Sequence, residues 1–200
     1  MKTDVIVATG NAGKLKEIGQ IMSGFPFVLH ALKDYWDPLP VIPEQGATFL
    51  ENARGKSQWV FSRTGIMSLA DDSGLEVDFL QGQPGVRSAR FAGERATDGQ
   101  NVEKLLSMMA QCPPHQRGAR FRCAVVFTVS DQEEITAEGV CEGAIEYVKN
   151  GNGGFGYDPV FTPRGFNETF AQLDASIKNG ISHRGKALLK LQGKLHDRFK

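Results

Sequence analysis

The chain opens with an apolar run that gives way to a helical pattern of apolar positions. Residues 4–8 are short and rich in β-branched side chains, which predicts a buried strand. After a Thr-Gly-Asn turn, apolar side chains recur at helical spacing until Gly24 and Pro26 end the pattern. The sequence therefore predicts an opening strand-loop-helix unit. The apolar positions of its helix are Leu15, Ile18, Ile21 and Met22.

A second helix and strand are predicted after a proline-rich loop over residues 38–43. Thr48 and Glu51 form a capping box that starts the helix, and Gly65 is its stop signal. Residues 66–70 predict a second buried strand, with Asp71-Asp72-Ser73-Gly74 at its C-terminal end. Sheets of α/β proteins carry their chemistry at this end of the strands, so we expect functional side chains there.

The rest of the chain adds a helix, a hairpin and a closing helix. The third helix starts near Thr97 and ends before the prolines at 113–114. The spacing then changes to alternation over residues 119–129, with a turn into a partner strand over 134–142. This order indicates an α/β or α+β fold around a mixed sheet. The apolar positions are Val102, Leu105, Leu106 and Met109; then Phe121, Cys123, Val125, Phe127 and Val129; and finally Leu188, Leu191, Leu195 and Phe199.

Length and charge narrow the classes of function. The 200 residues, 40% of them hydrophobic, fit one domain over 1–200, or one domain with a smaller lobe. The 23 basic and 23 acidic residues cancel, so no overall field favours nucleic acid or an anionic membrane. Neither a membrane span nor a signal-peptide pattern is present, so we expect a cytoplasmic protein. Cys112, Cys123 and Cys141 match no disulfide or metal spacing, and we expect reduced, structural thiols.

The loop Thr9–Lys14 is the first candidate binding site. Its glycines let backbone N–H groups approach a phosphate, while the helix N-terminus and Lys14 add positive potential. It is not a Walker A motif, because Ala8 and Leu15 replace the first glycine and the magnesium-binding Ser/Thr. The pattern thus argues against a P-loop ATPase, and leaves open phosphate binding or an ordinary turn between strand and helix.

Asp71 and Asp72 are the second candidate. Adjacent side chains at a strand end point to opposite faces, so we expect one carboxylate inward, one outward, and no shared proton. Together with Glu44, one of them could supply the sparse carboxylate coordination that Mg²⁺ has beside substrate phosphates. The alternative is that Asp71-Asp72-Ser73-Gly74 is simply a turn.

Two later segments could contact a nucleotide. Phe155 is flanked by glycines and could stack on a purine, although a flexible hinge with a core Phe fits the same pattern. Lys178, His183 and Arg184 lie just before or within the start of the last helix, where cations oppose the macrodipole. An anionic or carbonyl-bearing ligand would explain these three side chains, and a solvated basic turn is the alternative.

Together these motifs resemble the inosine/xanthosine triphosphate pyrophosphatase family over nearly the whole chain. The resemblance rests on Thr9–Lys14, Thr48–Lys56, Ala70–Gly74, Pro84–Arg90, Gly153–Pro159 and Ile181–Arg184. It implies hydrolysis of non-canonical purine nucleoside triphosphates (ITP, dITP and XTP) between the α- and β-phosphates, giving the monophosphate and pyrophosphate. It also implies an elongated mixed sheet flanked by helices, two lobes with a central cleft, and a homodimer.

The resemblance further implies a role for each matching residue. Asp72 would be the proton acceptor and, with Glu44, would hold Mg²⁺. The implied substrate contacts are Thr9, Gly10, Asn11, Ala12, Gly13, Lys14 and Lys56 for the triphosphate; Ser73; Phe155, Gly156, Tyr157 and Asp158 around the nucleoside; and Lys178, His183 and Arg184 for base and phosphate.

Base choice follows from hydrogen-bond chemistry. A donor such as the Arg184 guanidinium would satisfy the 6-keto oxygen of hypoxanthine or xanthine, whereas adenine has an amino donor there. Two other functions fit the same motifs: a Maf-like pyrophosphatase acting on other nucleotides, and a non-catalytic nucleotide sensor. Nucleic-acid binding ranks last because the charges balance.

Overall fold

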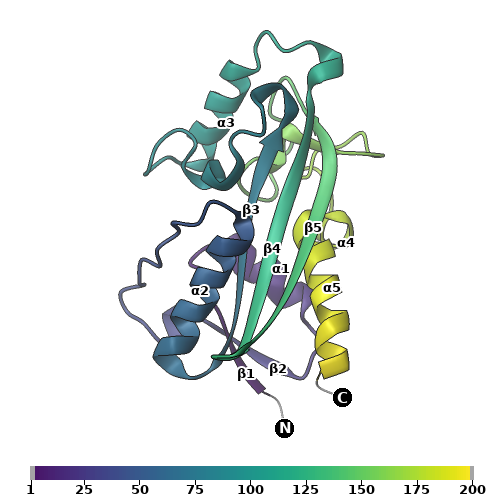
Figure 1. Ribbon diagram of the computed structural model, residues 1–200. Coiled ribbons are helices and arrows are strands. Elements are labelled where there is room, and N and C mark those ends of the chain that lie inside the picture. Colours follow the sequence, from purple (N-terminus) through teal and green to yellow (C-terminus); the bar gives the residue numbers. More distant parts are fainter. Residues whose placement is uncertain (1–2, 199–200) are drawn as a thin grey trace. The chain divides into compact units, whose positions relative to one another are not determined.

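The computed structural model describes residues 3–198 and has a mixed α/β fold (Figure 1). Its main elements are β1 Thr3–Val7, α1 Ala12–Ile21, β2 Phe27–Ala31, α2 Phe49–Thr64, β3 Met67–Val77, α3 Asp98–Met108, β4 Gly118–Ser130, β5 Glu133–Ile145, β6 Phe161–Pro163, α4 Ala175–Ile181 and α5 His183–Arg198. Within residues 3–198 the strands form a six-stranded sheet in the order β2-β1-β3-β4-β5-β6. β1 pairs in parallel with β2 and β3, and β6 is antiparallel to β5. The sheet is therefore mixed, as expected from the sequence.

The first two helices form where the sequence predicts them. In α2, Thr48 accepts the N–H of Glu51 as N-cap, and Gly65 closes the helix at φ 66° in the left-handed region that glycine enters without strain. The strand β2 was not predicted from the sequence, and Phe27 is the one buried residue among its five. Parallel pairing with β1 along all five residues holds this segment as a strand.

The strand β3 corrects the sequence prediction. It does not end at Ala70 but continues for 11 residues to Val77, so Asp71-Asp72-Ser73-Gly74 lies within a strand and is not a turn. Both aspartates are buried, with 0% of Asp71 and 7% of Asp72 exposed, so the expectation that one points outward is wrong. Charged residues can continue a strand here because helices on both faces supply partners for them.

The later elements follow the predicted order, with longer strands and an additional helix. The hairpin of β4 and β5 turns at Asp131-Gln132, as predicted. The helix α4 was not predicted, and Lys178 lies in it, whereas His183 is the first residue of α5. Phe199, the last predicted apolar position of the closing helix, lies outside the described residues.

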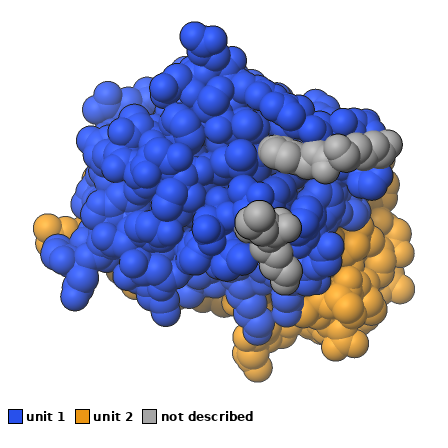
Figure 2. Space-filling view, turned by 90° about the horizontal axis from the view of Figure 1, so that it is seen from below, with its two compact units in different colours: residues 1–72, 123–139, 184–200 blue, residues 73–122, 140–183 orange. Residues whose placement is uncertain are grey.

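The chain divides into two compact units, which Figure 2 shows in separate colours. Unit 1 comprises residues 1–72, 123–139 and 184–200, and unit 2 comprises residues 73–122 and 140–183. Each unit has its own core.

In unit 1, α1 and α5 cover one face of the sheet and α2 covers the other (Figure 1). Val5, Val7 and Leu69 pack toward α1 and α5, whereas Ile6 and Ala70 pack on the side of α2. In unit 2, α3 packs on the sheet through the predicted positions Val102, Leu105 and Met109. The alternation of side chains along β1 and β3 therefore decides which helix each residue faces.

Two further expectations can be compared with the structure. Cys112, Cys123 and Cys141 are all buried, and none of them forms a disulfide within residues 3–198. Among these residues, too, no helix combines the length and the apolar character that a membrane crossing requires.

Candidate active site

The loop between β1 and α1 presents backbone amides at the N-terminus of α1. Asn11 caps this helix, because its side chain accepts the N–H of Lys14 at 3.0 Å. The N–H of Asn11 in turn donates to Thr9 Oγ1 at 3.2 Å. Gly10 is exposed, and a Cβ added there would meet no atom within 4 Å. Packing therefore does not require glycine at position 10, whereas close approach of a ligand to an exposed amide would favour it.

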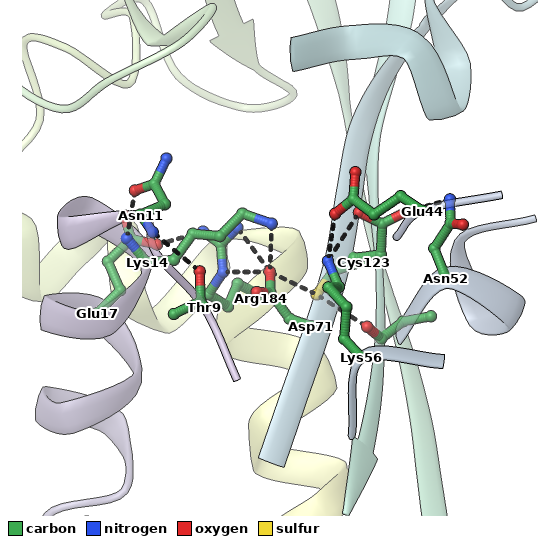
Figure 3. Close-up of polar contacts among 12 residues, drawn as sticks. Thr9, Asn11, Lys14, Glu17, Glu44, Asn52, Lys56, Asp71, Cys123 and Arg184 are labelled. Atoms are coloured by element: carbon green, nitrogen blue, oxygen red, sulfur yellow. Dashed lines mark hydrogen bonds and ion pairs between the residues drawn. The ribbon is translucent and has the colours of Figure 1, made fainter. Parts of the chain in front are cut away.

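Asp71 lies on the face of β3 that α1 and α5 cover, and cations from both helices reach it. Lys14 Nζ lies 3.1 Å from Asp71 Oδ2, and Arg184 donates to the same oxygen from Nε at 3.0 Å. Arg184 also donates from Nη1 to Glu17 at 2.5 Å. These ion pairs connect both helices to the strand, and Figure 3 shows their residues Lys14, Glu17, Asp71 and Arg184.

Asp72 lies on the opposite face of β3, where α2 supplies its partners. Asn52 Nδ2 donates to Asp72 Oδ2 at 3.0 Å, and Lys56 Nζ lies 3.3 Å from Asp72 Oδ1. The same Lys56 Nζ donates to Glu44 Oε1 at 2.8 Å. One ammonium group therefore holds two carboxylates, one from the strand and one from the loop before α2.

The two neighbouring aspartates have opposite pKa shifts. Burial disfavours ionisation of Asp71, but Lys14, Arg184 and Lys56 outweigh it and hold its pKa well below the usual range. For Asp72, burial is the largest influence and raises the pKa despite the attraction of Lys56 and Lys14. Burial also disfavours the charged form of Lys56, but Asp72, Asp71 and Glu44 raise its pKa overall. Asp71 is thus a fixed anion, and Asp72 the stronger base.

Unit 2 contains the glycine-rich segment around Phe155, held by a buried ion pair. Asp158 accepts the N–H of Phe155 at 2.9 Å and the ammonium of Lys178 at 2.5 Å. Lys178 Nζ lies 4.9 Å from the centroid of the Phe155 ring. Gly154 has φ 72°, and a Cβ there would come within 2.0 Å of Asp158, so only glycine fits. The half-buried Phe155 is therefore positioned by its neighbours and does not sit on an unsupported hinge.

Tyr157 and His183 anchor the same region to the core of unit 2. The Tyr157 hydroxyl donates to the carbonyl oxygen of Ser88 at 2.8 Å, and burial raises the pKa of this phenol, which keeps it a donor. The His183 ring stacks on Phe121 with centroids 4.6 Å apart. Both residues are buried, which differs from the solvated basic turn that was the alternative for His183.

A hollow of about 440 Å³ lies beside the glycine-rich segment in unit 2. The first turn of α3 forms one wall, with Asp98 accepting the N–H of Gly156 at 2.8 Å. Its volume falls within the range of about 300–1,000 Å³ that is typical of small-molecule sites. Its other polar and aromatic lining residues include Lys149, Asn152 and Phe155.

The predicted site residues fall into two groups. Unit 1 contains Thr9–Lys14, Glu44, Lys56, Asp72 and Arg184, and unit 2 contains Ser73, Phe155–Asp158, Lys178 and His183. Within unit 1 the structure brings Lys56, Glu44 and Asp72 together. Arg184 is 1% exposed and bound to carboxylates of the protein, so the contact predicted between its guanidinium and the base stays a prediction.

Two residues of the clusters in unit 1, Glu17 and Asn52, were given no role from the sequence. Glu17, which binds Arg184, follows Lys14 by three positions on α1, a spacing that places both on one helical face. Asn52, which binds Asp72, precedes Lys56 by four positions on α2 and faces the same carboxylate. The spacing was a usable signal for Asn52, because Lys56 was already a candidate.

The fold and site define an α/β protein in which lysines and carboxylates gather on both faces of β3 in unit 1. Residues 5–194 match the Ham1 family. A dITP/XTP pyrophosphatase of Photobacterium profundum is 47% identical over 195 residues, covering 96% of this chain and 98% of the relative. Another dITP/XTP pyrophosphatase, from Geobacter sulfurreducens, is 45% identical over 193 residues and 96% of each chain. A solved HAM1 protein from Coxiella burnetii has a TM-score of 0.87 at 36% identity, covering 98% of this chain and 99% of its own.

This chain belongs to the Ham1 family. The resemblance inferred from its sequence motifs is therefore confirmed.

Proposed function

We propose that this chain hydrolyses non-canonical purine nucleoside triphosphates, namely ITP, dITP and XTP, to the monophosphate and pyrophosphate. The observation that carries the proposal is full-length similarity to dITP/XTP pyrophosphatases, combined with the grouping of Lys56, Glu44 and Asp72. This activity removes such nucleotides from the pool before they enter DNA or RNA.

In unit 1, the loop and its lysine provide the triphosphate contacts. The exposed residues Gly10 and Ala12 and the positive end of α1 suit phosphate oxygens. Lys14 and Lys56 add positive charge that the carboxylates Asp71, Asp72 and Glu44 keep in place. This positive charge stabilises the negative charge that develops on the phosphoryl oxygens and the leaving pyrophosphate.

We propose Mg²⁺ as the cofactor, with Glu44 and Asp72 as the residues that would hold it. Both carboxylates already contact one cation, the Lys56 ammonium, so the pair suits a hard cation. Residues 3–198 contain no group of three or more His, Cys, Asp or Glu side chains placed to hold a metal. Two carboxylates fit a metal that takes its remaining ligands from substrate phosphates and water. When bound, it supplies electrostatic stabilisation of the phosphoryl charge.

Asp72 acts as the proton acceptor for the attacking water. Its pKa is raised chiefly by burial, so it accepts a proton more readily than an ordinary aspartate. Water attacks the α-phosphorus, its proton passes to the Asp72 carboxylate, and the bond to the β-phosphate oxygen breaks to release pyrophosphate. Lys56 and Asn52 hold the two oxygens of this carboxylate in place.

Unit 2 provides the nucleoside contacts, through Phe155 to Asp158 and the hollow beside them. Lys178 orients Phe155 through Asp158. His183 and Ser73 are the other substrate contacts proposed for this unit. Arg184, in unit 1, is the proposed donor to the 6-keto oxygen that hypoxanthine and xanthine share and adenine lacks.

A pyrophosphate-release panel tests the proposal. Purified protein with Mg²⁺ should release pyrophosphate from ITP, dITP and XTP far faster than from ATP, GTP or pyrimidine triphosphates. Equal rates on all purines would contradict the specificity, and tight ITP binding without release would indicate a sensor. We further propose that the protein is a homodimer and acts in the cytoplasm. Size-exclusion chromatography with light scattering measures the mass of the protein in solution and so tests the dimer.

A further inference from the structure

Two side chains of α2 address the same carboxylate from one face of the helix. Asn52 and Lys56 are four positions apart, so they lie one above the other, and both are buried. Asn52 contacts Oδ2 of Asp72 and Lys56 contacts Oδ1. Each oxygen of Asp72 therefore has its own partner on α2.

The orientation of the Asn52 amide is fixed by a backbone group. The N–H of Gly46 donates to Asn52 Oδ1 at 2.8 Å. A backbone N–H can only donate, so the oxygen of the amide must face Gly46 and its NH₂ group must face Asp72. Asn52 thus accepts from the loop with one end and donates to Asp72 at 3.0 Å with the other.

The loop that carries Glu44 is pressed against α2 at Gly46. A Cβ at Gly46 would lie 2.6 Å from Glu51 Cβ and 2.9 Å from Asn52 Oδ1, so a larger residue has no room. The loop is held at two points: Gly46 bonds to Asn52, and Glu44 bonds to Lys56. These two bonds fix where the Glu44 carboxylate lies relative to α2.

We propose that Asn52 is a positioning residue of the hydrolytic site, which locks the Asp72 carboxylate and the Glu44 loop into one arrangement through its two hydrogen bonds. This inference rests on the proposed function. Asn52 acts through Asp72 and Glu44 and is not itself a proposed substrate contact. Partners of this kind commonly set the orientation of catalytic and metal-holding carboxylates.

Two substitutions separate the two hydrogen bonds. Asn52→Asp keeps an oxygen for the Gly46 N–H but puts a second oxygen against Asp72, so only the bond to Asp72 is lost. Asn52→Ala removes both bonds. Asn101 offers a matched control, because this buried helical Asn also bridges two groups, accepting from Ala92 N–H at 2.8 Å and donating to the carbonyl oxygen of Ala89 at 3.1 Å. Asn101→Ala therefore reports the loss of a similar bridge that touches no carboxylate.

The experiment combines steady-state kinetics on ITP with amide hydrogen exchange measured by NMR on the metal-free protein. Both Asn52 variants should lower kcat about 10- to 100-fold, as loss of an outer partner typically does. KM should change less, because the loop Thr9–Lys14 is untouched. The Gly46 amide should stay protected in Asn52→Asp and exchange rapidly in Asn52→Ala, which shows that each bond was removed as designed.

The outcomes are distinguishable. If both Asn52 variants keep kcat within about twofold of wild type, or lose no more than Asn101→Ala at an equal loss of thermal stability, Asn52 is not a positioning residue. Unchanged protection of Gly46 in Asn52→Ala would also overturn the proposal, because the bridge would not exist. If the wild-type chain releases no pyrophosphate from ITP, dITP or XTP, the proposed function fails, and the inference fails with it. An active wild type with unaffected Asn52 variants overturns the inference alone.

Discussion

Asp71 and Asp72 lie on opposite faces of β3 in unit 1, and their pKa values are shifted in opposite directions. On one face, α1 and α5 place Lys14 and Arg184 on Asp71, and its pKa falls. On the other, α2 and its preceding loop give Asp72 one lysine, one amide and a second carboxylate, and burial raises its pKa despite that lysine. The two side chains belong to the same residue type and are adjacent in the chain, so the helices on each face cause the difference.

The contrast separates a stabilising carboxylate from a reactive one. Asp71 is a permanent anion that compensates buried cations, and its value lies in joining α1, α5 and the sheet. At Asp72, the effect of burial outweighs the attraction of the nearby cations, so the pKa of the carboxylate is raised. A carboxylate with a raised pKa is suited to take up a proton. Substitutions at the two positions should therefore affect different quantities.

The largest effect should come from Asp72→Asn. The amide has nearly the same size but is neither a base nor a good metal ligand, so kcat on ITP should fall by about 10²–10⁴-fold. Thermal stability should be kept or rise, because burial opposes the charge that is removed. The exposed Asp131→Asn is the control and should turn over normally. Full activity in Asp72→Asn would assign the proton acceptor to another group.

Asp71→Asn should chiefly cost stability. It leaves Lys14 without this carboxylate and Arg184 with one acidic partner fewer, and breaking such a buried pair costs about 3–5 kcal/mol. Urea unfolding at pH 7, with EDTA present, measures the loss. An unchanged midpoint would mean that Asp71 does not hold α1 and α5 to the strand.

The pH dependence of these two stability effects has opposite signs. The pKa of Asp71 is lowered on folding, so its contribution is present above the unfolded value of about 3.9 and is lost as pH falls below it. The gap between wild type and Asp71→Asn should therefore narrow on acidification. The pKa of Asp72 is raised, so its charge costs stability at neutral pH, and protonation removes that cost as pH falls.

The sequence predicted part of this arrangement. Alternation along a strand was enough to predict that Asp71 and Asp72 point to opposite faces, and the structure confirms it through their different partners. It was not enough to show that both faces are covered, because the composition of Asp71-Asp72-Ser73-Gly74 is that of a turn. What keeps these residues in the strand is the cations of three helices, and those helices meet the strand only in the folded chain.

Ser57→Ala tests whether the packing of α2 against the sheet affects activity at Asp72. The Ser57 hydroxyl lies 2.9 Å from Ser68 Oγ and 2.7 Å from Thr128 Oγ1, and all three residues are buried. Without the Ser57 hydroxyl, the buried hydroxyl groups of Ser68 and Thr128 each lose a hydrogen-bond partner. This loss costs about 1–3 kcal/mol of unfolding free energy. We expect kcat to fall far less than in Asp72→Asn. A loss of activity as large as that of Asp72→Asn would show that the packing of α2 controls the site.

The smallest effect should come from the outer ion pair of α2. Arg54 Nη2 lies 2.6 Å from Glu134 Oε1 on β5, with 38% and 27% of the two side chains exposed. Water screens such a pair, so Arg54→Ala should cost no more than about 1 kcal/mol, with kcat unchanged. Urea unfolding at low and high salt measures it, and salt should remove the difference from wild type. A loss matching that of Ser57→Ala would mean that the outer surface of α2 holds the helix as firmly as its buried hydroxyls. The Asp72 face of the sheet would then depend on ionic strength, whereas the Asp71 face, with its cations buried against α1 and α5, would not.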